Sequence, residues 1–425
     1  MLYLKLNRDL SSILERQAST NVDVTAQVRE ILDNVKANGD DAVRKYMAEF
    51  DGYTGESMLA STAEIDEGVQ NAGNDFMRIL KRTVTQLTEY HKHQIEKSWQ
   101  FDKDNGVVMG QLVRPLSRVA LYVPGGTAAY PSTVLMNAVP AQLAGVNVQD
   151  ISIFTPVKAD GKVPDTILAA AKCCGISKVY KIGGAQAIAA AAYGTQTIPK
   201  VDKIVGPGNI YVATAKQLVY GIVDIDMIAG PSEILIVADE HANPRYIAAD
   251  MLSQAEHDEM ASAILVTTSE KLILATEIQL ASQLSQLPRR DIAKKSLENY
   301  GAAIVAKDLA HAFEISNDVA PEHLEILTQN PLDMLPYVKN AGSIFLGENT
   351  PEPLGDYMSG TNHVLPTGNT AKFSSPLGVY DFVKYSAYSY YPKQVLQEFS
   401  EDVITFAQLE GLDAHANAIK IRFED

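Results

Sequence analysis

The sequence predicts an α/β protein with two modules of parallel strands joined by helices. From Arg118 onward, short apolar runs alternate with amphipathic segments, as parallel strands and their connecting helices do. A second alternation of the same kind starts at Glu233, so the two modules meet near Gly230. The length of 425 residues, 46% of them apolar, provides for about two to four domains with sizeable cores.

The expected elements follow one another in this order. A mostly helical pattern, without an obvious site, covers residues 25–47 and 71–99. The first module alternates through residues 118–124, 132–145, 150–156, 166–174, 178–184, 186–194, 201–207 and 209–221. The second alternates through residues 233–239, 246–260, 262–269, 271–284, 301–306, 309–319 and 342–347. A separate tail begins at about Ser374. Because ligands of open α/β sheets bind outside the carboxyl ends of the strands, we expect the site residues in the loops that follow the apolar runs.

The composition favours small-molecule chemistry. A net charge of −16 argues against nucleic acid or an anionic membrane as the main partner. We find no apolar stretch of membrane-spanning length and no signal-peptide pattern, and therefore expect a cytoplasmic protein. The two cysteines, Cys173 and Cys174, are adjacent, so they cannot cross-link distant segments, and we expect them to be small buried residues.

Three glycine-containing turns follow strand-like runs of the first module. They are Tyr122 to Gly126, Ile182 to Gln186, and Gly206-Pro207-Gly208-Asn209, which has two of the three glycines of the usual dinucleotide fingerprint. Their coincidence suggests that one edge of this module binds a dinucleotide. Tyr122 can stack on or hydrogen-bond a nucleotide, and Gln186 and Asn209 can bond ribose or amide groups; each can equally cap a helix or brace a loop.

Four of the eight histidines occur in polar, glycine-rich or acidic settings: His257, His323, His363 and His415. The other four, His91, His93, His241 and His311, are expected at the solvated surface. Gln254 and His257 are three residues apart on an expected helix, so both side chains emerge on one face and can share a cation, although such a pair is more often a surface pair.

Two further segments support a metal site. Asp356 and His363 share a glycine-rich loop, and Glu410 and His415 lie near the end of the chain. Imidazole, carboxylate and amide donors suit zinc or a similar divalent ion. Spacing alone does not decide which histidines are ligands.

The dipeptide Glu322-His323 follows Pro321, a residue favoured at the first position of a helix, and is therefore expected at a helix start. A neutral imidazole accepts an alcohol proton near working pH, and the adjacent carboxylate can activate water. A solvent-facing charged first turn explains the same residues equally well.

Six motifs occur in the order typical of histidinol dehydrogenases, and the resemblance spans essentially the whole chain. They are GPGN, AGPSE, SQAEHD, APEHLE, GDYMSGTNHVLP and EGLDAHA. The resemblance implies two incomplete Rossmann-like domains with small helical N-terminal and C-terminal domains. The domain bounds that we expect are residues 1–25 for an N-terminal helical segment, 26–120 with 233–373 for a zinc and substrate domain, 121–232 for an NAD-side domain and 374–425 for the tail.

The resemblance also implies a site and a partner. It implies one zinc ion per subunit held by Gln254, His257, Asp356 and His415, with the imidazole and amine of the substrate as the remaining ligands. The same residues, together with Ser232, Glu410 and His323, are then substrate contacts, and Tyr122, Gln186 and Asn209 are NAD contacts. The tail is implied to complete the site of the partner in a homodimer. Residues 156–165 depart from the family by being longer, which we interpret as a surface loop.

Zinc-dependent oxidation of L-histidinol to L-histidine through histidinaldehyde, with two NAD, is the function that we expect. His323 is the expected base for the hydroxyl proton, and Glu322 is expected to activate the water that adds to the aldehyde. A zinc hydrolase with Glu322 or Glu256 as its base is a rival, but it leaves the glycine turns unexplained. A non-catalytic metal- or nucleotide-binding protein leaves the acid, the base and the ligands unexplained.

Overall fold

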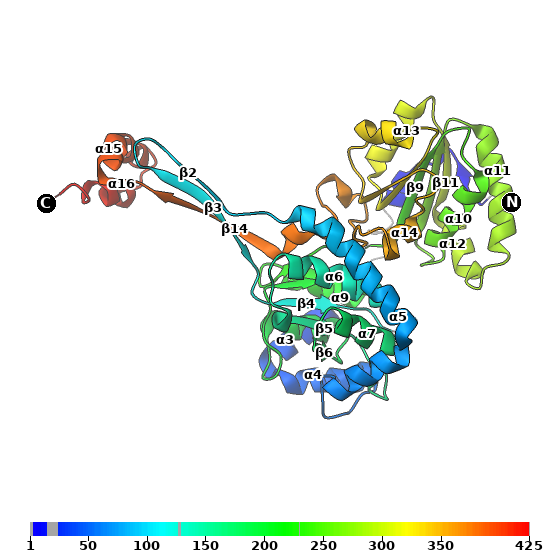
Figure 1. Cartoon of the computed structure of the whole chain (residues 1–425), viewed down its shortest axis with the longest axis horizontal. Helices are drawn as coiled ribbons and strands as arrows, with labels where there is room; N and C mark the ends of the chain where they lie inside the picture. Colours follow the sequence, from blue (N-terminus) through cyan, green and yellow to red (C-terminus); the bar gives the residue numbers. More distant parts are fainter. Residues whose placement is uncertain (1–2, 15–23, 126–128, 229, 425) are drawn as a thin grey trace. The chain divides into compact units, whose positions relative to one another are not determined.

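Two parallel sheets organise most of the chain, because strands that are buried on both faces require continuous apolar runs. The computed structural model describes residues 3–14, 24–125, 129–228 and 230–424. The chain divides into a large unit, Met1–Gln94 with Leu116–Phe382, and a small unit, Ile95–Pro115 with Val383–Asp425. Both parallel sheets belong to the large unit (Figure 1). The predicted α/β class with two parallel-sheet modules is confirmed.

The first sheet has five strands in the order β6-β5-β4-β7-β8, all parallel. The strands are β4 (Val119–Tyr122), β5 (Ile151–Phe154), β6 (Lys178–Tyr180), β7 (Lys203–Val205) and β8 (Asp224–Ile225). In chain order this is 3-2-1-4-5, the strand order of a dinucleotide-binding fold without its sixth strand. The connecting helices are α6 (Pro131–Leu143), α7 (Asp165–Cys173), α8 (Gly184–Tyr193) and α9 (Ile210–Val219), with a 3-10 turn at η3 (Val148–Asp150).

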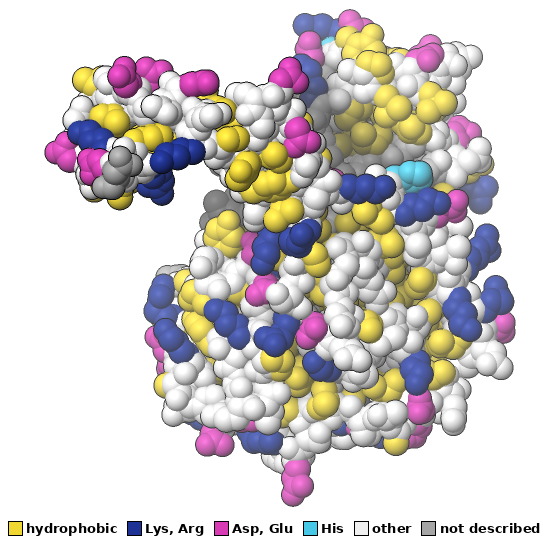
Figure 2. Space-filling view, turned by 60° about the vertical axis from the view of Figure 1, so that its left-hand side comes forward, with side chains coloured by type: hydrophobic (Ala, Val, Ile, Leu, Met, Phe, Trp, Pro, Cys, Tyr) yellow, Lys and Arg dark blue, Asp and Glu magenta, His cyan; other side chains and the backbone are white. Residues whose placement is uncertain are grey.

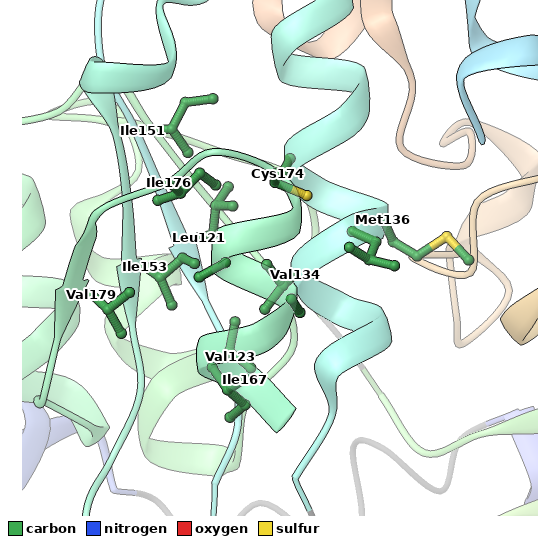
Figure 3. Packing of buried hydrophobic residues seen from close by; sticks show 14 of the residues in the cluster. Leu121, Val123, Val134, Met136, Ile151, Ile153, Ile167, Cys174, Ile176 and Val179 are labelled. Atoms are coloured by element: carbon green, nitrogen blue, oxygen red, sulfur yellow. The ribbon is translucent and has the colours of Figure 1, made fainter. Parts of the chain in front are cut away.

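Alternate residues of these strands enter two different cores. Leu121 and Ile153 pack with α6 and α7 on one face, and Cys174 closes that cluster (Figure 3). Ala120, Tyr122 and Phe154 pack with α8 and α9 on the other face. Every residue of β4, β5 and β7 is therefore buried, as the continuous apolar runs required.

The N-terminal helices cover the five-stranded sheet. They are α3 (Thr25–Asn38), α4 (Asp40–Tyr46), the π-helical turn η1 (Met47–Asp51), α5 (Thr62–His91) and η2 (Lys92–Gln94). α3 packs against α8 and α9, and α5 packs against α6 and α7. We expected residues 26–120 in one domain with residues 233–373. Periodicity identifies the apolar face of a helix but not which sheet it covers, so these bounds stay a prediction.

The second sheet has six parallel strands in the order β1-β11-β10-β9-β12-β13. The strands are β1 (Lys5–Leu6), β9 (Glu233–Ala238), β10 (Ser262–Thr267), β11 (Gly301–Val305), β12 (His323–Leu327) and β13 (Ser343–Leu346). The helices are α1 (Ser11–Leu14), α10 (Pro244–Ala255), α11 (Glu270–Leu284), α12 (Arg290–Tyr300), α13 (Leu309–Val319) and α14 (Glu352–Tyr357), with 3-10 turns η4 (Pro331–Tyr337), η5 (Thr370–Lys372) and η6 (Val379–Phe382). One face packs on α10, α11 and α12, and the other on α13.

The expected N-terminal helical segment, residues 1–25, lies partly outside the described residues. Within them, Lys5–Leu6 is a strand that pairs in parallel with β11, and only Ser11–Leu14 is helical. Two residues were too few for periodicity to indicate a strand.

The small unit combines a three-stranded antiparallel sheet with two helices. The sheet has the order β14-β3-β2, with β2 (Trp99–Asp102), β3 (Val108–Pro115) and β14 (Val383–Tyr390). The helices are α15 (Lys393–Leu409) and α16 (Asp413–Lys420). The sequence led us to expect a tail from Ser374; the pairing of β14 with a hairpin from residues 95–115 was not predicted, because pairing across so many residues leaves no local pattern.

Two expectations for single residues are wrong. Pro321 and Glu322 do not begin a helix: α13 ends at Val319, and β12 begins at His323 between β9 and β13. The five residues of β12 are all buried, and central pairing overrides the preference of proline for a helix start. His91 is fully buried rather than solvated, and its Nδ1 lies 2.8 Å from the Gln94 side-chain oxygen.

Among the described residues, no helix combines the length and the apolar character needed to cross a membrane.

Candidate active site

A polar cavity of about 330 Å³ gathers most of the predicted metal, substrate and catalytic residues. Ser232, Gln254, His257, Glu322, His323 and Asp356 all line it, and so do His363 and Glu352. All of these residues belong to the large unit. The sequence therefore predicted a set of residues that the fold brings together.

The cavity lies at the amino ends of β9 and β12. Ser232 directly precedes β9 and Glu322 directly precedes β12, and the parallel register pairs His323 with Ile234. Our expectation that site residues follow the carboxyl ends of the strands is therefore wrong for the six-stranded sheet. The rule concerns ligands held by one open sheet, whereas Pro124 and Gly206 of the other sheet also line this cavity.

His323 is held in one orientation by a backbone carbonyl. Its Nδ1 lies 2.9 Å from the carbonyl oxygen of Glu233. Since a carbonyl only accepts, Nδ1 carries the hydrogen and Nε2 keeps its lone pair. Burial lowers the pKa of His323 to about 4, so the imidazole is neutral at pH 7. A neutral imidazole with a free Nε2 is suited to accept a proton or to bind a metal.

Glu322 is buried beside a second glutamate. Its Oε2 accepts a hydrogen bond of 2.9 Å from the backbone N–H of Glu233. Burial raises the pKa of Glu322 well above its usual value, and the carboxylate of Glu233 raises it further. Without a cation nearby, burial therefore favours the protonated form of Glu322.

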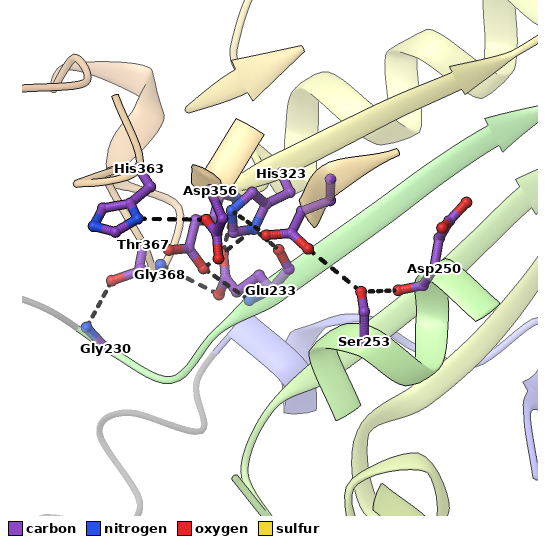
Figure 4. A network of polar contacts seen from close by, with 11 residues as sticks. Gly230, Glu233, Asp250, Ser253, His323, Asp356, His363, Thr367 and Gly368 are labelled. Carbon is purple, nitrogen blue, oxygen red and sulfur yellow. Dashed lines mark hydrogen bonds and ion pairs between the residues drawn. The ribbon is translucent and has the colours of Figure 1, made fainter. Parts of the chain in front are cut away.

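Two carboxylates four residues apart on α14, those of Glu352 and Asp356, lie near the imidazole of His323, and Figure 4 shows Asp356 beside it. Glu352 Oε1 lies 3.6 Å from His323 Nε2, and one ligand atom from each of His323, Glu352 and Asp356 lies within 4.8 Å of the others. Burial, together with the charge of Asp356, raises the pKa of Glu352 to about 8. Carboxylates that crowd one another disfavour each other's negative charge, and a bound divalent cation relieves this repulsion.

Gln254 and His257 meet at the end of α10. Gln254 lies in the last turn, and His257 lies just beyond it, with its backbone N–H donating to the Gln254 carbonyl at 3.1 Å. The helix predicted for both residues thus ends at Ala255, but the three-residue spacing still brings both side chains to the cavity. The amide oxygen of Gln254 is buried and has no hydrogen-bond partner among the described residues.

The remaining candidates fall into two groups. His363 lies in the cavity with its Nδ1 3.6 Å from Asp356 Oδ1. Glu410 and His415 belong to the small unit, where Glu410 directly follows α15 and His415 is in the first turn of α16; both are exposed. These two residues are not among the residues that line the cavity.

A larger cavity of about 880 Å³ lies at the carboxyl ends of β4, β5 and β6, the edge at which the sequence led us to expect a nucleotide. It is lined by all three predicted nucleotide contacts, Tyr122, Gln186 and Asn209. Gly125 lines the large cavity and its neighbour Pro124 lines the polar one; Asn209 and Gly208 divide in the same way. The two cavities therefore meet at these two turns.

The three predicted nucleotide contacts differ in the hydrogen bonds that they already form within the protein. The Tyr122 hydroxyl accepts from the backbone N–H of Gly184 at 3.0 Å, and the Asn209 side-chain oxygen caps α9 at 3.1 Å from the Tyr211 nitrogen. These are the loop-bracing and capping roles that the sequence left open. Gln186 is only 1% exposed, and neither polar atom of its side chain has a hydrogen-bond partner among the described residues. Such an amide is available to a ligand.

Comparison with known proteins covers both units. The sequence model of a family described as "Histidinol dehydrogenase" matches residues 14–423. The chain is 59% identical to histidinol dehydrogenase of Lactococcus lactis subsp. lactis, over 99% of this chain and 98% of that protein. It is 54% identical to histidinol dehydrogenase of Clostridium acetobutylicum, over 97% and 95%. This chain belongs to the histidinol dehydrogenase family. A crystal structure of histidinol dehydrogenase from Elizabethkingia anophelis superposes with a TM-score of 0.93 at 36% identity, covering 100% of this chain and 99% of that one.

We did not identify two polar residues of this histidinol dehydrogenase site from the sequence. Glu352 precedes Asp356 by four residues, the spacing that places both on one side of a helix, so the signal was present in PEPLGDYM. Glu233 lies within an apolar run, and its Oε1 accepts from the backbone N–H of Gly368 at 3.2 Å. A single carboxylate at the start of a strand gave no pattern to detect.

Proposed function

We propose that this chain oxidises L-histidinol to L-histidine, consuming two NAD and one water per turnover. Membership of the histidinol dehydrogenase family supports this reaction. The observation that carries it is the junction of two cavities, one polar with an imidazole base and carboxylates, the other large enough for a dinucleotide. A substrate carbon at the junction would reach a cofactor in the large cavity.

We further propose zinc as the cofactor of the polar cavity, with Gln254, His257 and Asp356 as its ligands from this chain. The unpaired buried amide oxygen of Gln254 and the imidazole and carboxylate donors fit such an ion. Bound zinc would hold the imidazole and amine of the substrate, and bound NAD would accept the hydride. Ser232, His323 and Asp356 line the space that the substrate would enter. In the large cavity, Tyr122, Gln186 and Asn209 are the proposed NAD contacts.

His323 is the proposed base in both oxidations. Its Nε2 accepts the hydroxyl proton of the alcohol as the carbinol carbon loses hydride, which gives the aldehyde. Glu322, as a carboxylate, takes a proton from the water that adds to the aldehyde, and the resulting diol loses the second hydride to give the carboxylate. The hydrogen bond from His323 Nδ1 to the Glu233 carbonyl fixes the direction in which Nε2 points. Holding the reacting carbon still for both steps is the main contribution of the site.

We also propose a homodimer in which Glu410 and His415 of the tail enter the partner's site, His415 as the fourth zinc ligand. The small unit that carries them exposes many large apolar side chains, which favours contact with another protein surface (Figure 2). They include Trp99, Phe101, Tyr390, Phe399, Phe406 and Leu409. The predicted domain bounds given above stay part of this proposal.

The test is the formation of NADH from purified protein, zinc, NAD and limiting L-histidinol. Two NADH and one histidine per histidinol are expected. Release of histidine without reduction of NAD would support a hydrolase, and binding of zinc or NAD without turnover would support a non-catalytic protein.

A further inference from the structure

The large cavity contains a carboxylate for which the proposed mechanism has no use. Asp51 is the last residue of the π-helical turn η1 and lines the cavity beside Phe50. Its Oδ2 is buried, and no described residue donates a hydrogen bond to it. Burial raises the pKa of Asp51 to about 6. Buried polar atoms without partners are rare, and π-helical turns occur frequently at functional sites, so this carboxylate requires an explanation.

The large cavity has two ends along the order of the strands. Asp51 lies at the end that is farther from the polar cavity. The turns shared by the two cavities follow β4 and β7. On the other side of β4, the loop after β5 packs against η1: a Cβ placed on Gly52 would lie 3.4 Å from the Cβ of Ala159. The nicotinamide must reach the polar cavity to accept the hydride. The adenosine half of the cofactor therefore lies toward Asp51.

The usual ribose acceptor of a dinucleotide-binding sheet is missing from its ordinary place. In such folds an acidic residue at the end of the second strand bonds the ribose 2′-hydroxyl. The second strand here is β5, and it is followed by Thr155, Pro156 and Val157, none of them acidic. Asp160 in the loop after β5 and Asp165 at the start of α7 also line the cavity, but both are exposed, and Asp160 already accepts a hydrogen bond from the backbone N–H of Lys162. Asp51 reaches the same cavity from the helical layer with a buried oxygen that has no partner among the described residues.

We propose that the Asp51 carboxylate accepts a hydrogen bond from the 2′-hydroxyl of the adenosine ribose and thereby selects NAD over NADP. The inference rests on the proposed NAD-dependent function. The 2′-phosphate of NADP would bring negative charge against the half-buried carboxylate of Asp51, which forms no ion pair with a described residue. Lys158 and Lys162 also line the cavity, but both are exposed and are available to the pyrophosphate.

Removal of the charge should change the choice of cofactor. Asp51→Asn should lower the ratio of kcat/KM for NAD to that for NADP at least about tenfold, mainly through KM. Glu49→Gln is the matched control, because Glu49 lies on the same turn, is exposed and does not line the cavity. Its ratio should stay at the wild-type value. Since Asp51 Oδ2 gives up no hydrogen bond, Asp51→Asn should keep the wild-type Tm.

An NAD analogue that lacks the adenosine 2′-hydroxyl tests whether this hydroxyl is the group that Asp51 binds. Wild type should use NAD at least about tenfold better than its 2′-deoxyadenosine analogue. Asp51→Ala should use the two equally, because the 2′-hydroxyl and the Asp51 carboxylate are the two partners of one hydrogen bond, and removal of either partner abolishes it. Equal discrimination by wild type and Asp51→Ala, or an unchanged ratio in Asp51→Asn, would overturn the inference while the proposed function stands. A wild-type protein that reduces neither NAD nor NADP with histidinol would overturn the proposed function, and the inference with it.

Discussion

At the scale of single residues, burial shifts His323 and Glu322 in opposite directions, because an imidazole is charged when protonated and a carboxyl group when deprotonated. Burial disfavours the charged form of each, so it keeps the imidazole neutral and ready to accept a proton, and it raises the pKa of the carboxyl group. Positive charge entering the cavity would lower the pKa of Glu322 and release its proton. The proposed division of labour therefore assigns Glu322 to the step that needs water.

Glu322→Gln separates the two oxidations. The amide has the shape of the protonated acid and can still accept from the Glu233 backbone N–H. Alcohol oxidation should stay within a few-fold of wild type, while aldehyde oxidation should fall about 10²-fold or more, because an amide cannot act as a base. Single-turnover measurements with histidinol and with histidinaldehyde provide the two rates. Equal losses in both would contradict the assigned role.

The metal can be assigned by two variants with opposite expectations. His257→Asn should lower bound zinc and activity together, whereas Glu352→Gln should keep the metal, if Gln254, His257 and Asp356 are the ligands. The structure also brings His323, Glu352 and Asp356 within ligand distance of one another, so the reverse result would move the ion to that set. His241→Asn is the control, since His241 is exposed and lies outside both cavities. Elemental analysis of dialysed protein measures the zinc.

At the scale of elements, the sequence predicted those features that a local pattern determines. Strands buried on both faces give continuous apolar runs, so both parallel sheets were predictable, and three-residue spacing placed Gln254 beside His257. The hairpin β2–β3 and its pairing with β14 depend on contacts distant in sequence. The choice between helix and strand at His323 depended on the neighbouring strands β9 and β13, which a proline rule cannot detect.

The turn after β7 shows how an element is fixed between two cavities. Lys216 of α9 donates to the Gly206 carbonyl at 2.9 Å, Asp226 accepts from the Gly206 backbone N–H at 2.7 Å, and the two side chains pair with each other. Gly206 has φ of +111°, and a Cβ there would lie 2.1 Å from the Tyr122 carbonyl oxygen. The buried pair thus holds the backbone of a residue that only glycine can occupy.

Loss of one partner of this pair should be costly. Lys216→Met leaves Asp226 buried without its counter-ion and should lower the free energy of unfolding by about 3–5 kcal/mol. The matched control is Lys172→Met, which breaks the half-exposed pair with Asp66 and should cost about 0–1 kcal/mol. Urea unfolding of the three proteins measures both. Similar losses in the two variants would show that the buried pair is not what fixes the turn.

At the scale of the whole molecule, the proposed site draws on residues of two units. His415, the proposed fourth zinc ligand, and Glu410, a predicted substrate contact, belong to the small unit, and the other proposed ligands belong to the large one. The small unit also exposes apolar side chains on its sheet and on α15. A partner that covers them while it receives the tail would account for both observations.

Complementation tests whether the tail serves the partner. A His257→Asn chain and a His415→Asn chain should each be inactive alone. In a mixed dimer with exchanged tails, one site receives both defects and the other receives neither, so the second site works. With random re-association half of the dimers are mixed and each has one intact site of two, so about a quarter of wild-type activity should return. A dimer in which each tail serves its own chain would have one defect in every site and would stay inactive. Mass measurement of the exchanged subunits makes that negative result decisive, because verified mixed dimers without activity would place His415 in its own chain's site.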